Sequence, residues 1–249
     1  CGEGLPLERN KGVSVVRTIV IGDIHGCFRE FQALLQKVKF DRESDRLILL
    51  GDVIDRGPDS ALVLQECQIL KRDMGERFIQ LLGNHEDMML DAYASFDRSL
   101  WNYNGGSTTR KSFYKYNMEI PPVLAYLRTL PLYYETEHYI CVHAAISCKG
   151  LEHTDRHTAI WDRKLAEDGT YSGKLVLYGH TPTEKVFYQP GDATCKAIIA
   201  GRTQPLPERG CIGLDTGCVA RNKLTAMVIE ENKPGGPVYQ LRQVEYGKR

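Results

Sequence analysis

The sequence predicts an α/β fold with two sheets, and two patterns carry this prediction. Over the first third of the chain, short and wholly apolar strands alternate with helices, which is typical of a parallel sheet covered by helices on both faces. The remainder holds further short strands with turns between them, which is more typical of a mixed or antiparallel second sheet. In parallel sheets, ligands bind beyond the carboxyl ends of the strands, so residues at those ends are the candidates for a site.

The first three strands are short apolar runs, each closed by a glycine: Gly22, Gly51 or Gly83. They span residues 18–21, 47–50 and 78–82. Two helices are expected between them. Residues 28–38 carry apolar side chains at helical spacing along one face, and residues 59–71 follow Gly57-Pro58, a helix-start signal.

The later part of the chain predicts more helix and then six strands. Residues 87–130 have a helical pattern that Asn104-Gly105-Gly106 interrupts, and residues 189–210 predict a long loop or hairpin insert. The six strands are expected at residues 132–134, 139–142, 175–178, 211–214, 224–229 and 238–244. Because no linker separates the halves, we expect residues 13–249 to form one domain after a loose lead-in of residues 1–12.

The composition excludes several classes of protein. Lys+Arg 32 equals Asp+Glu 32, so the net charge is zero, which argues against a nucleic-acid partner because such binders usually carry a basic excess. The longest uncharged apolar stretch, about residues 139–148, is shorter than the roughly 20 residues that span a bilayer, so no membrane partner is expected. None of the eight cysteines has C-x-x-C spacing, and no N-x-[ST] motif occurs, which favours a reduced, cytoplasmic protein.

Polar side chains that can bind metal follow five of the predicted strands. The segments are Gly22-Asp23-Ile24-His25-Gly26, Gly51-Asp52-Val53-Ile54-Asp55-Arg56-Gly57, Gly83-Asn84-His85-Glu86, His143 and Gly179-His180-Thr181. Carboxylate, imidazole and amide oxygen suit divalent ions such as Mn, Fe or Zn. Asp23 and His25 can share one ion because they are two residues apart in extended chain, and Asp52 can bridge two ions. Two ions about 3.5–4 Å apart would clamp a phosphate and activate a water.

Each of these residues has an ordinary structural explanation when it is taken alone. An Asp after a strand is often a turn residue or a helix cap, and a single His is more often a hydrogen-bonded structural group than a ligand. The ordered set of six ligand-type residues, each at a strand end, is what predicts a metal site.

The segments GDIHG, GDVIDRG, GNHE, VHA and GHTP resemble those of the calcineurin-like metallophosphoesterases. The resemblance runs from about residue 18 to residue 229. It is closest to the phosphoprotein phosphatase branch, including the small bacterial and phage Ser/Thr phosphatases, and it extends to the symmetrical diadenosine tetraphosphatases. It implies two mixed β-sheets packed face to face with helices outside, and a hydrolase with two divalent ions, Mn expected and Fe or Zn as alternatives.

The resemblance also implies a role for each matching residue. The metal ligands would be Asp23, His25, Asp52, Asn84, His143 and His180, with Asp52 shared by both ions. A hydroxide bridging the ions would attack phosphorus, and His85 would protonate the leaving oxygen, with Asp55 orienting it. Arg56 and Arg163, the latter in Trp161-Asp162-Arg163, would grip the phosphate as catalytic and substrate-binding residues, and Asn84 would also contact substrate.

Three functions remain open from the sequence. The first is a phosphatase acting on phosphorylated proteins, and the alternative is a bis(5'-nucleosyl)-tetraphosphatase acting on a dinucleoside polyphosphate. The chain keeps Asp55 and Glu86, as protein phosphatases do, whereas the 189–210 insert is longer than in the small phosphatases. The third is a metal-binding protein without activity, which the full set of ligands, acid and arginines disfavours. The substrate, the metal in vivo and the oligomeric state are left undetermined.

Overall fold

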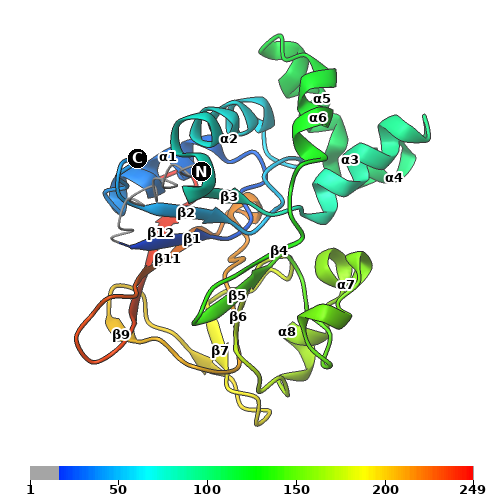
Figure 1. Cartoon of the computed structure of the whole chain (residues 1–249). Coiled ribbons are helices and arrows are strands. Elements are labelled where there is room, and N and C mark those ends of the chain that lie inside the picture. Colours follow the sequence, from blue (N-terminus) through cyan, green and yellow to red (C-terminus); the bar gives the residue numbers. More distant parts are fainter. Residues whose placement is uncertain (1–16, 249) are drawn as a thin grey trace, which may run out of the picture.

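The computed structural model describes residues 17–248, which form two six-stranded sheets with helices on their outer faces (Figure 1). The expected lead-in of residues 1–12 lies outside the described residues. The predicted α/β fold with two mixed sheets face to face is confirmed. Within residues 17–248 no helix is both long and apolar enough to cross a membrane.

The first sheet has the strand order β3-β2-β1-β11-β12-β9. Its strands are β1 (Thr18–Ile21), β2 (Arg46–Leu49), β3 (Phe78–Gln80), β9 (Thr203–Pro205), β11 (Lys223–Glu230) and β12 (Val238–Glu245). The first three strands are parallel, and β11 runs antiparallel beside β1, with Thr18 opposite Ile229. This sheet is therefore mixed.

The second sheet has the strand order β4-β5-β6-β10-β7-β8. Its strands are β4 (Tyr133–Glu135), β5 (Tyr139–Val142), β6 (Leu175–Tyr178), β7 (Phe187–Gln189), β8 (Lys196–Ala197) and β10 (Cys211–Gly213). Its three central strands, β5, β6 and β10, are parallel, and the outer strands pair antiparallel.

The helices cover the two outer faces. They are α1 (Phe28–Lys37), α2 (Ser60–Met74), α3 (Asn84–Ala94), α4 (Ser99–Trp101), α5 (Ser107–Lys115), α6 (Ile120–Leu127), α7 (Arg156–Trp161) and α8 (Lys164–Asp168), with short η1 (Gly75–Arg77), η2 (Asn102–Gly106), η3 (Leu151–His153) and η4 (Cys218–Ala220). Helices α1 and α2 lie on the first sheet, and α7 and α8 lie on the second (Figure 1).

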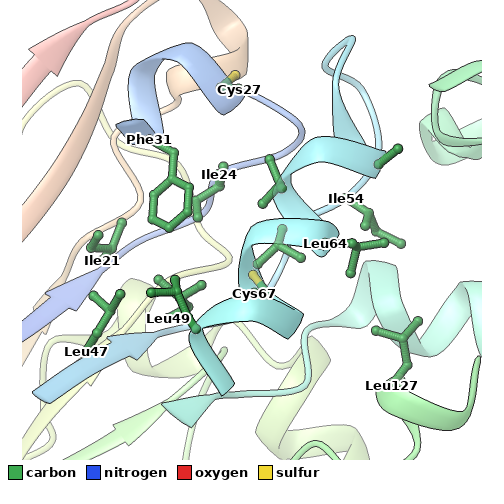
Figure 2. Close-up of a cluster of buried hydrophobic side chains, with 14 of the residues drawn as sticks. Ile21, Ile24, Cys27, Phe31, Leu47, Leu49, Ile54, Leu64, Cys67 and Leu127 are labelled. Atoms are coloured by element: carbon green, nitrogen blue, oxygen red, sulfur yellow. The ribbon is translucent and has the colours of Figure 1, made fainter. Parts of the chain in front are cut away.

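The alternation of side chains along the strands builds three apolar layers. Ile19 and Ile21 of β1 point to the helices, where they pack with Phe31 of α1 and Leu64 of α2 (Figure 2). The residue between them, Val20, points the other way into a core shared by both sheets. The third layer joins the second sheet to α7 and α8. Each central strand is buried on both faces, which is why its sequence is a continuous apolar run.

Two expectations about the sheets were wrong. The first sheet has helices on one face only, because the second sheet covers the other face. The runs at residues 224–229 and 238–244 are strands β11 and β12, which join the first sheet rather than the second. Local sequence indicates that a run is buried on both faces, but not which sheet supplies its neighbours.

The 189–210 insert is neither a plain loop nor one hairpin. Strand β8 within it pairs with β7 at the edge of the second sheet, and β9 pairs with β12 at the edge of the first. The insert therefore connects the outer edges of both sheets.

Candidate metal centre

The six expected ligands come together where five strands end. Asp23 and His25 follow β1, Asp52 follows β2, Asn84 opens α3 after β3, His143 follows β5 and His180 follows β6. All six side chains are buried. The two sheets thus bring together residues from both halves of the sequence.

Asp52 lies at the middle of this group. Its Oδ2 is 3.6 Å from His25 Nε2, and its Oδ1 is 3.5 Å from His143 Nε2. Two sets of three side chains offer ligand atoms within 4.8 Å of one another, and Asp52 belongs to both: His25, Asp52 and His85, and Asp52, His143 and His180. A carboxylate with two oxygens facing two different groups has the placement that a bridging ligand needs.

The imidazoles are oriented by backbone carbonyl groups. His25 Nδ1 donates to Ile54 O at 2.8 Å, and His143 Nδ1 donates to Leu50 O at 2.8 Å. A carbonyl can only accept, so the other ring nitrogen, Nε2, carries a lone pair turned toward Asp52. Metal-binding histidines are held in this way, through a hydrogen bond from the nitrogen that does not touch the metal.

His180 and Asn84 extend the same arrangement. His180 Nε2 donates to Trp161 O at 3.1 Å, which leaves Nδ1 with a lone pair 3.0 Å from Asn84 Oδ1. His143 Nε2 is also 3.0 Å from that amide oxygen. Three acceptor atoms that face one another repel unless a cation lies among them. The donor set therefore fits a divalent ion.

The three imidazoles have the protonation state that metal binding requires. Burial lowers the pKa of His25 and of His180 to about 3, and it lowers the pKa of His143. All three imidazoles are therefore neutral near neutral pH, which is the form that binds metal. Burial, followed by the carboxylates of Asp215 and Asp52, raises the pKa of Asp23. A cation would offset this repulsion.

The placement of Asp23 differs from the simplest expectation. It belongs to neither of the three-residue groups, and both of its oxygens accept from the backbone N–H of His180, at 3.2 and 3.1 Å. In the first group His85 lies where Asp23 was expected. A role for Asp23 as a ligand remains a prediction.

His85 and Asp55 form a buried pair beside the centre. His85 Nδ1 lies 2.7 Å from Asp55 Oδ2, and its Nε2 is buried without a hydrogen-bond partner among the described residues. Burial alone would lower the pKa of His85, but the carboxylates of Asp52 and Asp55 outweigh it and raise the pKa. The free Nε2 is therefore a nitrogen that can carry a proton and donate it to a bound group.

Sequence reasoning missed two residues that hold Asp55. The indole N–H of Trp101 reaches both carboxylate oxygens, at 3.1 and 2.9 Å, and the hydroxyl of Thr109 donates to Oδ1 at 2.6 Å. Both side chains are buried. With His85 they give Asp55 three donors, which fixes the carboxylate in place.

The Asn104-Gly105-Gly106 segment positions this network. A Cβ on Gly106 would lie 2.4 Å from the Trp101 ring, and one on Gly105 would lie 2.9 Å from the backbone nitrogen of Arg56. Gly105 also has a φ of 107°, in the region that favours glycine. The two glycines let η2 lie directly against the indole and against the loop after β2. This gives a physical reason for a segment that the sequence only marked as a helix break.

Glu86 is a third residue whose role the sequence did not reveal. Its carboxylate is fully buried and accepts from the backbone N–H groups of Gly83, Asp52 and Val53, at 3.0, 2.9 and 2.9 Å. Asp52 has a φ of 48°, an unfavourable left-handed conformation for a residue with a side chain. Glu86 thus holds the strained turn that presents Asp52. A Glu three residues after Gly83 was a signal that could have indicated this cap.

The two arginines differ in their surroundings. Arg56 is exposed, and its Nη1 donates to His25 Nε2 at 2.9 Å, so a guanidinium lies against the lone pair that was expected to bind an ion. Arg163 is exposed, and its Nη1 donates to Thr181 Oγ1 at 3.3 Å. Both positive groups border the centre, and neither is buried in an ion pair among the described residues.

Comparison with known proteins agrees with this arrangement. A family model described as calcineurin-like phosphoesterase matches residues 16–203. Serine/threonine-protein phosphatase 1 of Salmonella typhimurium is 32% identical over 176 residues, which are 67% of this chain and 79% of that protein. The symmetrical bis(5'-nucleosyl)-tetraphosphatase of Aromatoleum aromaticum is 38% identical over 130 residues, 51% of this chain and 43% of that protein. The chain therefore spans less than half the length of the second relative.

Solved structures show the same fold. A structure described as a putative diadenosine tetraphosphatase has a TM-score of 0.64 at 21% identity and covers 96% of both chains. A protein serine/threonine phosphatase from Saccharomyces cerevisiae has a TM-score of 0.63 at 17% identity, over 96% of this chain and 82% of the other. At these identities the comparison supports the architecture alone.

Proposed function

Because the chain belongs to the calcineurin-like phosphoesterase family of hydrolases, we propose that it hydrolyses phosphoesters at the centre around Asp52, with phosphoserine and phosphothreonine in proteins as its substrates. The observation that carries the proposal is the convergence of neutral imidazole lone pairs on one carboxylate, next to His85 with its free Nε2. The choice of protein substrates is supported by the match to most of the length of a Ser/Thr phosphatase.

Two divalent ions fit the residues of this centre. Asp23, His25 and Asp52 would hold one ion, and Asp52, Asn84, His143 and His180 would hold the other. Mn is the ion we propose because the set mixes carboxylate, amide and imidazole, with Fe or Zn as alternatives. When bound, the ions would neutralise phosphoryl charge and lower the pKa of a bound water.

The chain's own side chains supply the remaining chemistry. Arg56 and Arg163 would bind the phosphoryl oxygens through their planar guanidinium groups. Asn84 would orient the substrate. The proton on His85 Nε2 would pass to the departing oxygen, while Asp55 holds the opposite ring nitrogen. For His25 Nε2 to bind an ion, Arg56 Nη1 must leave it.

A second function, symmetrical cleavage of a dinucleoside tetraphosphate, is supported by the tetraphosphatase relative, whose identity is higher, at 38% against 32%, over a shorter match. Both functions use the same centre, so they differ in substrate rather than in chemistry.

A side-by-side assay with the Mn-loaded protein separates the two. We expect kcat/KM for a phosphoserine or phosphothreonine peptide to exceed that for diadenosine tetraphosphate by at least about tenfold, a difference of about 1.4 kcal/mol in transition-state binding. The reverse order would assign the second function. A protein that holds metal but hydrolyses neither compound would be a binding protein.

Metal dependence is tested on a nitrophenyl phosphate. After removal of metal with a chelator, activity should disappear, and Mn²⁺ should restore more of it than Fe²⁺ or Zn²⁺ at equal concentration. Full activity in the metal-stripped protein would contradict the two-ion proposal. A higher rate with Zn²⁺ would change only the identity of the metal.

We also propose a reducing, cytoplasmic setting on the sequence grounds given above. The burial of five cysteines, Cys27, Cys67, Cys141, Cys211 and Cys218, supports it, because they pack as small apolar side chains.

A further inference from the structure

Two cysteines and a glutamate meet where the loop after β1 leads into α1. Cys27 is the residue before α1 (Figure 2), Glu30 lies in the first turn of α1, and Cys218 opens η4 near the other end of the chain. The two sulfur atoms and one carboxylate oxygen all lie within 4.8 Å of one another, and all three side chains are buried. Among residues 17–248 this is the only such group that contains a thiol.

Glu30 is unusual for a buried carboxylate. It is only 8% exposed, and its one hydrogen bond from the described residues comes from the backbone N–H of Gly247, at 3.0 Å to Oε1. A buried carboxylate normally has a charged partner or several donors. One oxygen of this carboxylate lies within 4.8 Å of both sulfur atoms, and no positive group among the described residues is hydrogen-bonded to the carboxylate.

Two of the three side chains, those of Cys27 and Glu30, can be reached from solvent. Cys27 and Glu30 line a surface cavity of about 750 Å³ between α1, the loop around Pro58 and the residues that follow β12. The cavity provides an entry path and room for a water as a further ligand, both of which a metal site requires.

We propose that Cys27, Glu30 and Cys218 form a second metal site, distinct from the centre around Asp52, that binds one thiophilic divalent cation of the zinc or cadmium type. Two thiolates and a carboxylate suit such a cation, whereas Mn²⁺ prefers oxygen and nitrogen ligands. On binding, both thiols release their protons to solvent and each sulfur forms one bond to the cation. No oxidant or reductant takes part.

The neighbouring Cys27 thiol and burial raise the pKa of Cys218 above its usual range, so this thiol is protonated when no metal is bound. A cation would have to displace that proton. Once bound, it would join the segment from Asp23 to Cys27 to the turn from Asp215 to Cys218. These two segments are already neighbours, because a Cβ on Gly22, just before the first, would lie 3.1 Å from the backbone nitrogen of Asp215.

Cadmium absorption tests the proposal without using activity. A thiolate bound to Cd²⁺ gives a charge-transfer band in the ultraviolet, and the ligands around Asp52 contain no sulfur, so the band reports only on thiols. The reference protein carries Cys1→Ser, Cys148→Ser and Cys195→Ser, because Cys148 and Cys195 are exposed and Cys1 lies outside the described residues. It is kept in excess Mn²⁺ during the titration.

We expect a band that saturates at one Cd²⁺ per chain and that excess Mn²⁺ does not displace. Cys27→Ala and Cys218→Ala should each abolish the saturable band. Cys67→Ala, which removes a buried thiol elsewhere, should keep it. Glu30→Gln should keep the band but weaken Cd²⁺ affinity by at least about tenfold, since one ligand is lost.

Other outcomes would overturn the proposal. These are a reference protein with no saturable band, a band unchanged in Cys218→Ala, or a band that only Cys67→Ala removes. A mass lower by two hydrogen atoms, with no Cd²⁺ uptake, would show that the pair forms a disulfide instead. If either Cys→Ala variant fails to fold by circular dichroism, Glu30→Gln decides, because it preserves shape, and unchanged Cd²⁺ affinity in it rejects the site.

Discussion

His85 Nε2 is a buried nitrogen with no hydrogen-bond partner among the described residues, and its distance of 3.9 Å from Asp52 Oδ2 is too long for a hydrogen bond. If this nitrogen donates the proton to the leaving oxygen, its contribution depends on how basic that oxygen is. We expect His85→Asn to reduce kcat on a phosphoserine peptide by about 10²- to 10⁴-fold. The loss on nitrophenyl phosphate should be much smaller, because phenolate leaves without a proton.

Metal content distinguishes this effect from a structural one. Elemental analysis of His85→Asn should show as much metal as in the unmodified protein. Asp52→Asn is the matched control, and it should lose metal because both groups share that carboxylate. Equal losses of rate on the two substrates, with metal retained, would reject the acid role of His85.

Arg163 allows a test of phosphate binding that leaves the ligands undisturbed. Its contact with Thr181 is long, at 3.3 Å, and the side chain is exposed. We expect Arg163→Ala to raise the inhibition constant for inorganic phosphate by at least about tenfold while metal content stays constant, since an Arg–phosphate pair is charge-assisted. Arg163→Lys should recover only part of the affinity, because Lys lacks the planar fork. Loss of metal in Arg163→Ala would contradict this assignment.

At the residue scale, the sequence predicted which polar residues lie at the strand ends, but not the hydrogen bonds that hold them in place. Asp52, His143 and His180 were identifiable because each follows an apolar run, and strand ends converge in such a fold. The contact of Trp101 with Asp55 could not be predicted. The two residues are 46 positions apart, and the sequence does not show how the helices between them pack against one another. The contact of Arg56 with His25 depends on side-chain conformation, on which the spacing of residues carries no information.

The helical segment formed by α4, η2 and α5 is the element that completes the acid pair. It contributes the Trp101 indole and the Thr109 hydroxyl to Asp55, and its glycines make the close contact possible. Trp101→Phe removes one N–H and keeps most of the volume. We expect it to lower kcat on phosphoserine peptide several-fold more than on nitrophenyl phosphate, with KM little changed, because a less firmly held Asp55 orients His85 less well.

Tyr103→Phe is the control for that variant. Tyr103 lies on the same segment but is 90% exposed, so its hydroxyl should not affect either substrate. If Trp101→Phe lowered both rates equally, the indole would have a packing role only. If it changed neither rate, Thr109 and His85 would hold Asp55 sufficiently without it.

At the element scale, hydrophobic periodicity predicted the bounds of helices and strands closely, but it did not predict which strands pair with one another. The strand at residues 18–21 and the strands at 139–142 and 175–178 have the expected bounds. Helix α2 runs to Met74, three residues beyond expectation, because Leu70 and Met74 continue its apolar face. The placement of β11 in the first sheet follows from its pairing with β1 across most of the chain, and β12 joins the sheet by pairing with β11. No local pattern encodes the first of these pairings.

At the scale of the whole molecule, the two sheets share an apolar core that lies between them. Leu177 of β6 is fully buried in it. We expect Leu177→Ala to reduce the free energy of unfolding by about 2–5 kcal/mol, because it leaves a cavity between two sheets that cannot easily close. Leu100→Ala, at an exposed position of α4, should change it by no more than about 0.5 kcal/mol. Urea denaturation of both variants measures the difference, and similar values would show that the sheets do not share one core.

The antiparallel pairing of β1 with β11 also bears on how the protein is made. Strand β1 emerges from the ribosome about 200 residues before β11, the strand that closes its second edge. At about 5–20 residues per second, that edge stays open for roughly 10–40 s of translation. The backbone N–H of Gly22 bonds to Thr225 O at 3.2 Å, so it lacks this acceptor for the same length of time. Until β11 has been made, the nascent chain therefore exposes an unpaired apolar strand edge, and this edge is where a chaperone would bind, or where two nascent chains on one polysome would pair with each other.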